Sequence, residues 1–240
     1  FKFLSNADLV EGWGILKREI FIIIWVAIFL IMSFYLFGSF FGKLKFNYKS
    51  YSGWFFLLFS MYLISGLFES KNVRLLSGIL PPEFYSVYDN KNDCPLGLNC
   101  FKDFQSGKDY AIEKDKIILL DFTGWACANC RRMEENVWSK PAIFKMLDTE
   151  FVIISLYVDD RSKLSEQEKF KYLNKSGNIQ YINNVGRRWS LFQQINFSNA
   201  SQPYYVAMMP SGKILTEPIQ YVSEKNFENW LRTSIEESIK

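Results

Sequence analysis

The 240 residues contain no histidine. This absence excludes Ser–His and Cys–His catalysis, imidazole-ligated metal sites and haem attachment, which needs a histidine directly after its cysteine pair. Cysteine is scarce too: there are four, all after position 93. The formal net charge is only +3 and no long block of like charge occurs, so we expect no nucleic-acid partner. We expect no bound cofactor either.

Apolar residues are concentrated in the first 68 positions, although the mean hydropathy of the chain is −0.04. Residues 20–42 carry no charge and, at about 1.5 Å per residue, would reach about 34 Å, enough to cross a bilayer. A second uncharged run, residues 50–68, would reach about 28 Å. We therefore predict a membrane segment at residues 1–78 with two spans in a lipid bilayer. A pair of buried helices in a soluble core is the alternative.

The loop between the two runs, residues 43–49, holds three lysines and no acidic residue. The positive-inside rule places such a loop in the cytoplasm. Two spans return the chain to the side from which it came, so we expect the residues after Phe68 outside the cytoplasm. Because the chain begins with Phe1 and soon becomes membrane-like, we interpret it as a piece of a longer protein.

Residues 79–105 are typical of a linker, with consecutive prolines at 81 and 82 and a polar run at 89–93. Residues 106–240 alternate apolar runs with amphipathic stretches. The order β-α-β-α, then β-β-α, with a Cys-x-x-Cys motif after the first strand, predicts an α/β thioredoxin-like domain preceded by a two-helix transmembrane segment. Helices are expected at 103–115, at 127–138, from 141, around 189–192 and from 223 or 224. Strands are expected at 116–123, 151–158, 204–209 and from 214. A polar stretch follows residue 158, and a turn is expected at 210–213.

Cys127 and Cys130 stand where the first strand meets its helix. Free N–H groups and the helix dipole favour the Cys127 thiolate and lower its pKa, which makes Cys127 the attacking thiol. Cys130, one turn further in, is placed to resolve the mixed disulfide. An inert disulfide and a zinc site remain alternatives. Zinc would also need Cys94 and Cys100, whose spacing is unusual for that metal.

Three further residues are candidates for supporting roles. Asp121 interrupts the apolar strand, where burial would raise its pKa and let it take the Cys130 proton, unless it reaches solvent. Glu134, four residues after Cys130, shares its helix face, which is either functional or solvated. Pro203 precedes a strand and is either an ordinary strand start or a cis-proline against the cysteine pair, which the order along the chain favours.

The segment from Asp121 to Trp138 resembles the C-terminal domain of the DsbD family of thiol:disulfide interchange proteins, in a Bacteroidetes-type form. Residues 155–160, residues 201–206 and the two apolar runs are similar as well, so the resemblance covers nearly the whole chain. Two features depart from the family. The tryptophan usually adjacent to the first cysteine is one position earlier, at Trp125, and the membrane cysteines that relay electrons are absent.

The resemblance implies transfer of electrons from cytoplasmic thioredoxin across the bacterial inner membrane to periplasmic disulfide proteins. Carried over by position, Cys127 attacks, Cys130 resolves, Asp121 and Glu134 are the acids around them, and Pro203 is the cis-proline. We therefore expect a membrane-tethered protein-disulfide reductase module facing the periplasm. Its expected partners are a membrane electron-donor domain of the same longer protein and periplasmic disulfide-containing proteins. A disulfide oxidase or isomerase, and a non-enzymatic zinc or scaffold module, remain alternatives.

Cys94 and Cys100 are expected to pair as a structural disulfide, because an oxidising compartment leaves few thiols free. Pro95 and Gly97 between them allow the tight turn that such a pairing needs. A second redox pair that passes electrons to Cys127 is the alternative.

Overall fold

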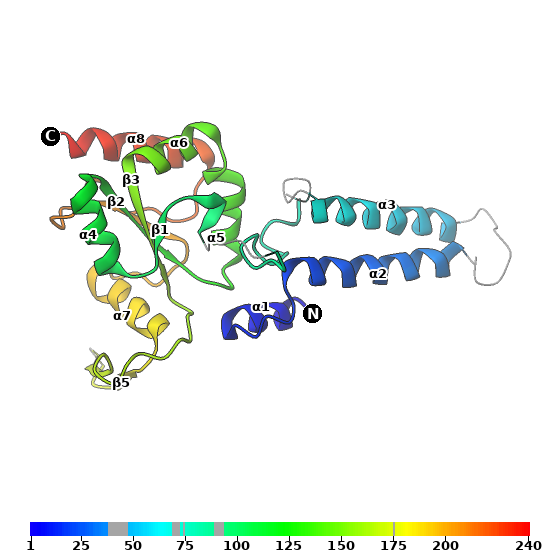
Figure 1. Cartoon of the computed structure of the whole chain (residues 1–240), viewed down its shortest axis with the longest axis horizontal. Helices are drawn as coiled ribbons and strands as arrows, with labels where there is room; N and C mark the ends of the chain where they lie inside the picture. The colour runs from blue at the N-terminus through cyan, green and yellow to red at the C-terminus, as the bar shows by residue number, and fades with distance from the viewer. Residues whose placement is uncertain (38–47, 69–72, 74, 89–93, 175) are drawn as a thin grey trace. The chain divides into compact units, whose positions relative to one another are not determined.

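The computed structural model describes residues 1–37, 48–68, 73, 75–88, 94–174 and 176–240. The chain divides into two compact units, residues 1–9 with 13–91 and residues 10–12 with 92–240. The segment expected to be a linker, residues 79–105, is thus shared between the units. Its last part is folded into the second unit, where Cys100–Phe101 forms strand β1 (Figure 1). Residues 89–93 of that segment lie outside the described residues.

The first unit contains helices α1 (Lys2–Glu11), α2 (Arg18–Phe37) and α3 (Tyr48–Phe68). Helices α2 and α3 lie side by side (Figure 1), with the rings of Phe29 and Phe59 5.0 Å apart. The Ser33 hydroxyl donates to the Gly53 carbonyl at 2.8 Å, and a side chain at Gly53 would collide with the Phe37 ring. Both helices are long and apolar enough to cross a membrane by length and composition.

Two sequence predictions about this unit fall partly on residues that the structure does not describe. The first span was expected over residues 20–42, and helix α2 covers this range as far as Phe37. Residues 38–42 lie outside the described residues. So do residues 43–47, most of the lysine-containing loop on which the predicted orientation rests.

Helix α1 was not predicted. The loop after it is held by the Asp8 carboxylate, which accepts from the Ile15 and Leu16 amides at 3.0 and 2.8 Å.

The second unit is built on a four-stranded sheet in the order β1-β3-β2-β6. Strands β2 (Ile117–Thr123) and β3 (Phe151–Tyr157) are apolar, buried along their length and parallel, with β1 parallel on the outer side of β3. Strand β6 (Tyr204–Met208) runs antiparallel to β2. The carboxyl ends of β2 and β3 therefore meet at one edge of the sheet, where the Cys-x-x-Cys segment follows β2.

Helices cover both faces of this sheet (Figure 1). Because side chains alternate along a strand, odd-numbered positions of β2 and β3 point to one face and even-numbered positions to the other. Ile118 and Leu120 pack with α4 (Phe104–Lys114) and α7 (Val185–Phe197). Ile117 and Leu119 pack with the opposite layer. That layer consists of α5 (Ala128–Met133), the π-helical turn η4 (Glu134–Trp138), α6 (Pro141–Glu150) and α8 (Glu224–Ser238).

The structure corrects two expectations about this unit. The stretch after 158, predicted only to be polar and assigned no strand, contains an antiparallel hairpin of β4 (Phe170–Leu173) and β5 (Ile179–Ile182), held against α7 by Ile182 and Leu191. The strand expected from Ile214 onward is reduced to isolated bridges with β6. The ladder is not continuous because the register shifts between the bridges: the five-residue step from Ile214 to Ile219 is matched by only three residues of β6, from Met208 back to Tyr205.

Candidate thiol–disulfide site

Cys127 and Cys130 form a disulfide at the start of α5. Cys127 is the N-cap residue of this helix, and its sulfur accepts a hydrogen bond from the Cys130 amide at 3.2 Å. Cys127 is half-buried, whereas Cys130 is only 1% exposed. The two sulfurs therefore differ as the sequence predicts: one can be reached from solvent at a helix N-terminus, and the other is shielded one turn below.

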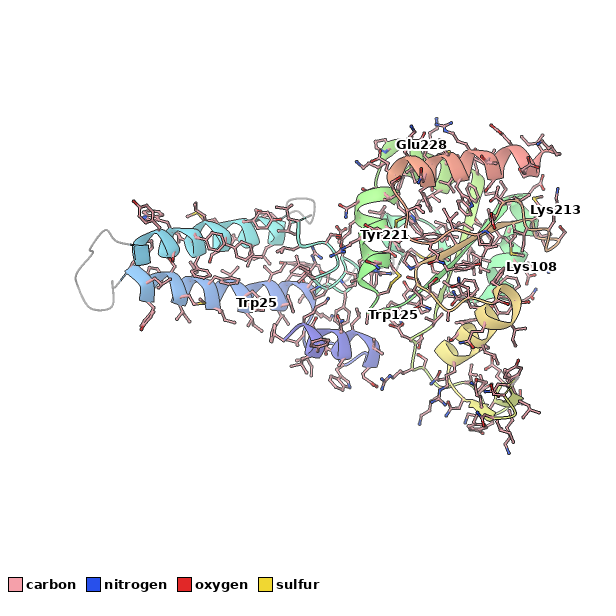
Figure 2. The ribbon with its side chains drawn as sticks, turned by 180° about the vertical axis from the view of Figure 1, so that it is seen from behind. Trp25, Lys108, Trp125, Lys213, Tyr221 and Glu228 are labelled. Atoms are coloured by element: carbon pink, nitrogen blue, oxygen red, sulfur yellow. A yellow bond between two sulfur atoms is a disulfide. The ribbon has the colours of Figure 1, made fainter. Side chains whose placement is uncertain are left out.

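The loop before the disulfide is fixed by a residue from the end of β3. The Asp159 carboxylate accepts from the Trp125 amide at 2.8 Å and from the Ala126 amide at 3.0 Å. The Trp125 ring, labelled in Figure 2, stacks on Tyr157 with 3.8 Å between ring centroids, and the Lys102 ammonium lies 5.0 Å from its centroid. Trp125 thus packs beside Tyr157 although it is one position further from the cysteine than in the resembled family.

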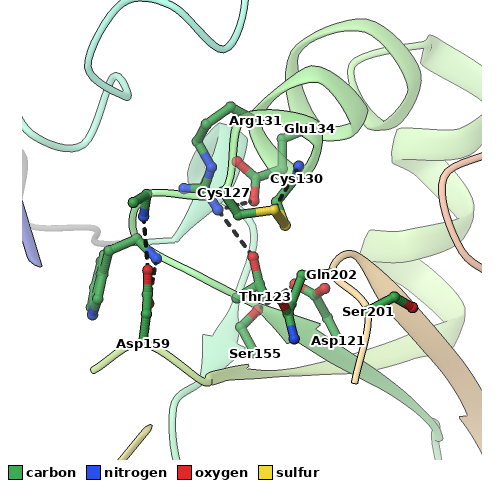
Figure 3. Close-up of a disulfide and its surroundings, with 12 residues drawn as sticks. Asp121, Thr123, Cys127, Cys130, Arg131, Glu134, Ser155, Asp159, Ser201 and Gln202 are labelled. Atoms are coloured by element: carbon green, nitrogen blue, oxygen red, sulfur yellow. Dashed lines mark hydrogen bonds and ion pairs between the residues drawn. A yellow bond between two sulfur atoms is a disulfide. The ribbon is translucent and has the colours of Figure 1, made fainter. Parts of the chain in front are cut away.

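A buried ion pair lies beside the disulfide. The Arg131 guanidinium is 2.7 Å from the Glu134 carboxylate, and these side chains are 4% and 7% exposed. Arg131 also donates to the Thr123 hydroxyl at 3.2 Å. Figure 3 shows this pair on the helix side of the disulfide, with Asp121, Thr123 and Ser155 on the sheet side. Glu134 therefore lies on the same helix face as Cys130, and that face is not solvated.

Asp121 is completely buried on β2, on the face covered by α5. One carboxylate oxygen accepts from the Ser155 hydroxyl at 3.1 Å, and the other has no hydrogen-bond partner among the described residues. Burial raises the pKa of this carboxyl to about 7, against the opposing effects of the Arg131 charge and the Ser155 hydrogen bond. The alternative that Asp121 reaches solvent is wrong, and its ionisation falls near neutral pH.

Two tyrosines complete the walls of this buried polar cluster. Burial raises the pKa of Tyr157 and of Tyr205, and the neighbouring carboxylates raise both further against the opposing charge of Arg131. Both phenols therefore stay protonated at neutral pH. Sequence analysis did not single out Tyr157 or Asp159 as partners in the site, and it did not predict that Arg131 is buried against Glu134. The one available signal was the placement of Tyr157 and Asp159 at the end of a buried strand parallel to β2.

Pro203 is brought to the same edge of the sheet. The peptide bond between Gln202 and Pro203 is cis, the isomer that the sequence analysis favoured. Tyr204, the next residue, pairs with Phe122 of β2, so Pro203 lies at the level of Thr123, just before the Cys-x-x-Cys loop. In Figure 3, Gln202 and Ser201 lie on the sheet side of the disulfide, away from Arg131.

Cys94 and Cys100 also form a disulfide. It joins the short turn η3 (Pro95–Gly97) to β1, and Leu98 between the two cysteines is buried against Val137 and Trp138. Cys100 pairs with Ile153, four residues before Tyr157, which is about 13 Å back along the strand from the edge that carries Cys127. The zinc alternative needed four thiolates, whereas here each sulfur is bonded to another sulfur.

Comparison with known proteins agrees with this geometry. Residues 104–235 match the family described as thioredoxin-like domain. This is more than half of the chain, which therefore belongs to that family. A search of curated proteins found no match.

Solved structures with low sequence identity are similar as well. A thioredoxin from Thermus thermophilus is 17% identical with a TM-score of 0.41, covering 57% of this chain and 87% of that one. DsbH oxidoreductase is 12% identical with a TM-score of 0.40, covering 58% and 85%. A thioredoxin-fold protein from Helicobacter pylori is 16% identical with a TM-score of 0.32, covering 52% and 86%.

The fold and the site together define the class of the protein. A thioredoxin-like domain carries a disulfide between cysteines three residues apart at a helix start, with one sulfur accessible and the other buried above an acid. This arrangement supports thiol–disulfide oxidoreductase activity.

Proposed function

We propose that this chain is a membrane-tethered protein-disulfide reductase module that passes electrons through Cys127 and Cys130 to extracytoplasmic protein disulfides. The observation that carries the proposal is the asymmetry of the pair: Cys127 is half-buried at a helix N-terminus and Cys130 is shielded. The accessible thiolate attacks a substrate disulfide, and the shielded thiol then releases the product. The direction rests on the resemblance to the DsbD family.

The tether is helices α2 and α3, whose length and composition suit a lipid bilayer. In this proposal they lie in a bacterial inner membrane and the thioredoxin-like unit faces the periplasm. The electron donor is a membrane domain of a longer protein, because every cysteine of the chain lies after position 93 and none can relay electrons within the two spans.

The assignment of the two thiols is tested by trapping. Cys130→Ser should accumulate mixed disulfides with partner proteins, because the first attack survives and the second step is lost. Cys127→Ser should trap little, because Cys130 is buried and lacks the helix N-terminus. Non-reducing gels of envelope fractions, with dithiothreitol as the reversal control, measure the adducts. Equal trapping by both variants would refute the assignment, and trapping by neither would remove the case for thiol exchange.

A measured reduction potential separates reductase from oxidase. A potential near that of thioredoxin, about −270 mV, supports the proposed direction, whereas a value near −120 mV, as in strongly oxidising proteins of this fold, contradicts it. The potential is measured with the purified full-length chain and does not depend on the trapping result. The direction of electron flow and the roles of the two thiols are therefore tested independently.

A further inference from the structure

Arg131 follows the buried cysteine directly and is itself buried, with 3% of its surface exposed. A guanidinium without solvent requires a counter-charge, since an isolated buried charge is costly. Glu134 supplies it at 2.7 Å, and Thr123 accepts a second hydrogen bond from the same nitrogen at 3.2 Å. Arg132, the next residue on the same helix, is exposed.

The two carboxyls near the disulfide therefore have different surroundings. Glu134 has a cation in contact, which stabilises its ionised form. Asp121 has no ion pair among the described residues; it has one hydrogen bond from Ser155 and one oxygen without a partner. Among the described residues, the charge of Arg131 on α5 acts on Asp121 directly, and Tyr157 on β3 and Tyr205 on β6 each interact with Asp121, Arg131 and Glu134 on η4.

We infer that Arg131 is a positioning residue, which holds Glu134 as a carboxylate and leaves Asp121 as the one carboxyl that exchanges a proton with Cys130. The inference rests on the thiol exchange proposed above and assigns different roles to the two acids near the disulfide. Enzymes commonly separate the roles of two nearby carboxyls by giving them different environments. Arg131 makes that difference here and touches no reacting atom.

The step begins from a mixed disulfide between Cys127 and a substrate sulfur. The Cys130 thiol gives its proton to the Asp121 carboxylate, and the resulting thiolate forms a bond to the Cys127 sulfur. The bond between Cys127 and the substrate breaks, and its electron pair leaves with the substrate sulfur, which takes up a proton from water. Over the full reaction the two cysteines lose two electrons and two protons, and the substrate disulfide gains them.

The step predicts opposite effects for the two partners of the ion pair. Resolution needs ionised Asp121, so the pH midpoint of its rate follows the acidity of that carboxyl. Arg131→Met removes a nearby positive charge and should raise the midpoint, by one to three pH units at roughly the usual size of such effects. Glu134→Gln removes a nearby negative charge and should lower it. Arg131→Lys should restore most of the wild-type midpoint, because the charge is kept.

The experiment uses the full chain in detergent, with Cys127 and Cys130 reduced and the Cys94–Cys100 disulfide verified by mass spectrometry. Stopped-flow reaction with 5,5′-dithiobis(2-nitrobenzoate) releases one thionitrobenzoate on attack and a second on resolution. The rate of the second phase is measured from pH 5 to 9. Arg132→Met is the matched control, since it removes the same charge from the same helix at an exposed position, and its midpoint should not move.

Failure of the inference and failure of the proposed function give different results. A wild-type chain without a second phase contradicts thiol resolution by Cys130 and therefore the function itself. A normal second phase whose midpoint ignores Arg131→Met and Glu134→Gln, or moves in the same direction in both, overturns the role of Arg131 alone. Should Arg131→Met fail to fold, Glu134→Gln decides the inference, because the predicted fall in its midpoint does not depend on the other variant.

Discussion

Asp121→Asn isolates how a buried acid beneath the disulfide affects the stability of the thioredoxin-like unit. The pKa of Asp121 rises from 3.8 to about 7 on folding, chiefly through burial. The folded state therefore keeps its proton over a pH range in which the unfolded chain has released it. Because the folded state binds more protons in this range, stability falls as the pH rises from about 4 to 7 and changes no further above it.

The size of this effect follows from the shift. Each pKa unit corresponds to about 1.4 kcal/mol, so the buried carboxyl costs roughly 4 kcal/mol above pH 7 and roughly 2 kcal/mol at pH 5. Asparagine cannot ionise, and this contribution disappears in the variant. The new amide has its own cost of about 1–3 kcal/mol if its N–H groups find no acceptor, but that cost is the same at every pH. The difference between pH 5 and pH 8, about 2–3 kcal/mol, is therefore the diagnostic quantity.

The measurement is urea unfolding of the oxidised full chain, followed by hydrogen–deuterium exchange of peptides from β2 and β3. Asp148→Asn makes the same chemical change at an exposed position of α6 and serves as the control. The wild type and this control should lose stability between pH 5 and pH 8 to the same extent, and Asp121→Asn should lose about 2–3 kcal/mol less. An unchanged slope in Asp121→Asn would show that the carboxyl titrates near its ordinary value, and the reasoning from burial would fail.

Two other predictions concern the second disulfide and the tether. Replacing Cys94 and Cys100 by serine should lower the stability of the thioredoxin-like unit by about 2 kcal/mol, from the loss of a short cross-linked loop. Insulin reduction should be nearly unchanged in that variant, and a loss of activity at unchanged stability would instead support an electron relay. In spheroplasts, a membrane-impermeant maleimide should label reduced Cys127 without lysis, with Cys127→Ser as the control. Labelling that appears only after lysis would contradict the proposed periplasmic location.

Much of the second unit can be predicted from its sequence because its strongest signals are local. The apolar runs that became β2 and β3 are bounded by charged residues, and both strands are one residue shorter than expected. Pro141 begins α6 and Ser223 caps α8, accepting from the Asn226 amide. The β4–β5 hairpin was missed because each strand has only four residues and both lie within a mostly polar stretch. The hairpin is held by the packing of Ile182 against Leu191 of α7, and the local sequence does not reveal this long-range contact.

The burial of Arg131 shows where sequence reasoning stops. Arg131 and Glu134 are three residues apart, a spacing that allows an ion pair on any helix and usually indicates a solvated one. Here both side chains of the pair point into the protein, because α5 lies on the face of the sheet that carries Asp121 and Thr123. A helix whose charged pair is buried looks, in sequence, like a helix whose charged pair is exposed.

The same limit explains why the acids could be named but not placed. Along β2 and β3, the even-numbered positions are apolar to the end, whereas the odd-numbered positions change from apolar to polar partway along. That change occurs at the same level in both strands, because the parallel register pairs Asp121 with Ser155 and Thr123 with Tyr157. Either strand alone contains one polar interruption that could face solvent. Only the register brings the two interruptions together under α5, where Thr123 accepts from Arg131 and Asp121 accepts from Ser155 in one buried polar cluster. The odd-numbered positions are Ile117, Leu119, Asp121 and Thr123 in β2, and Phe151, Ile153, Ser155 and Tyr157 in β3.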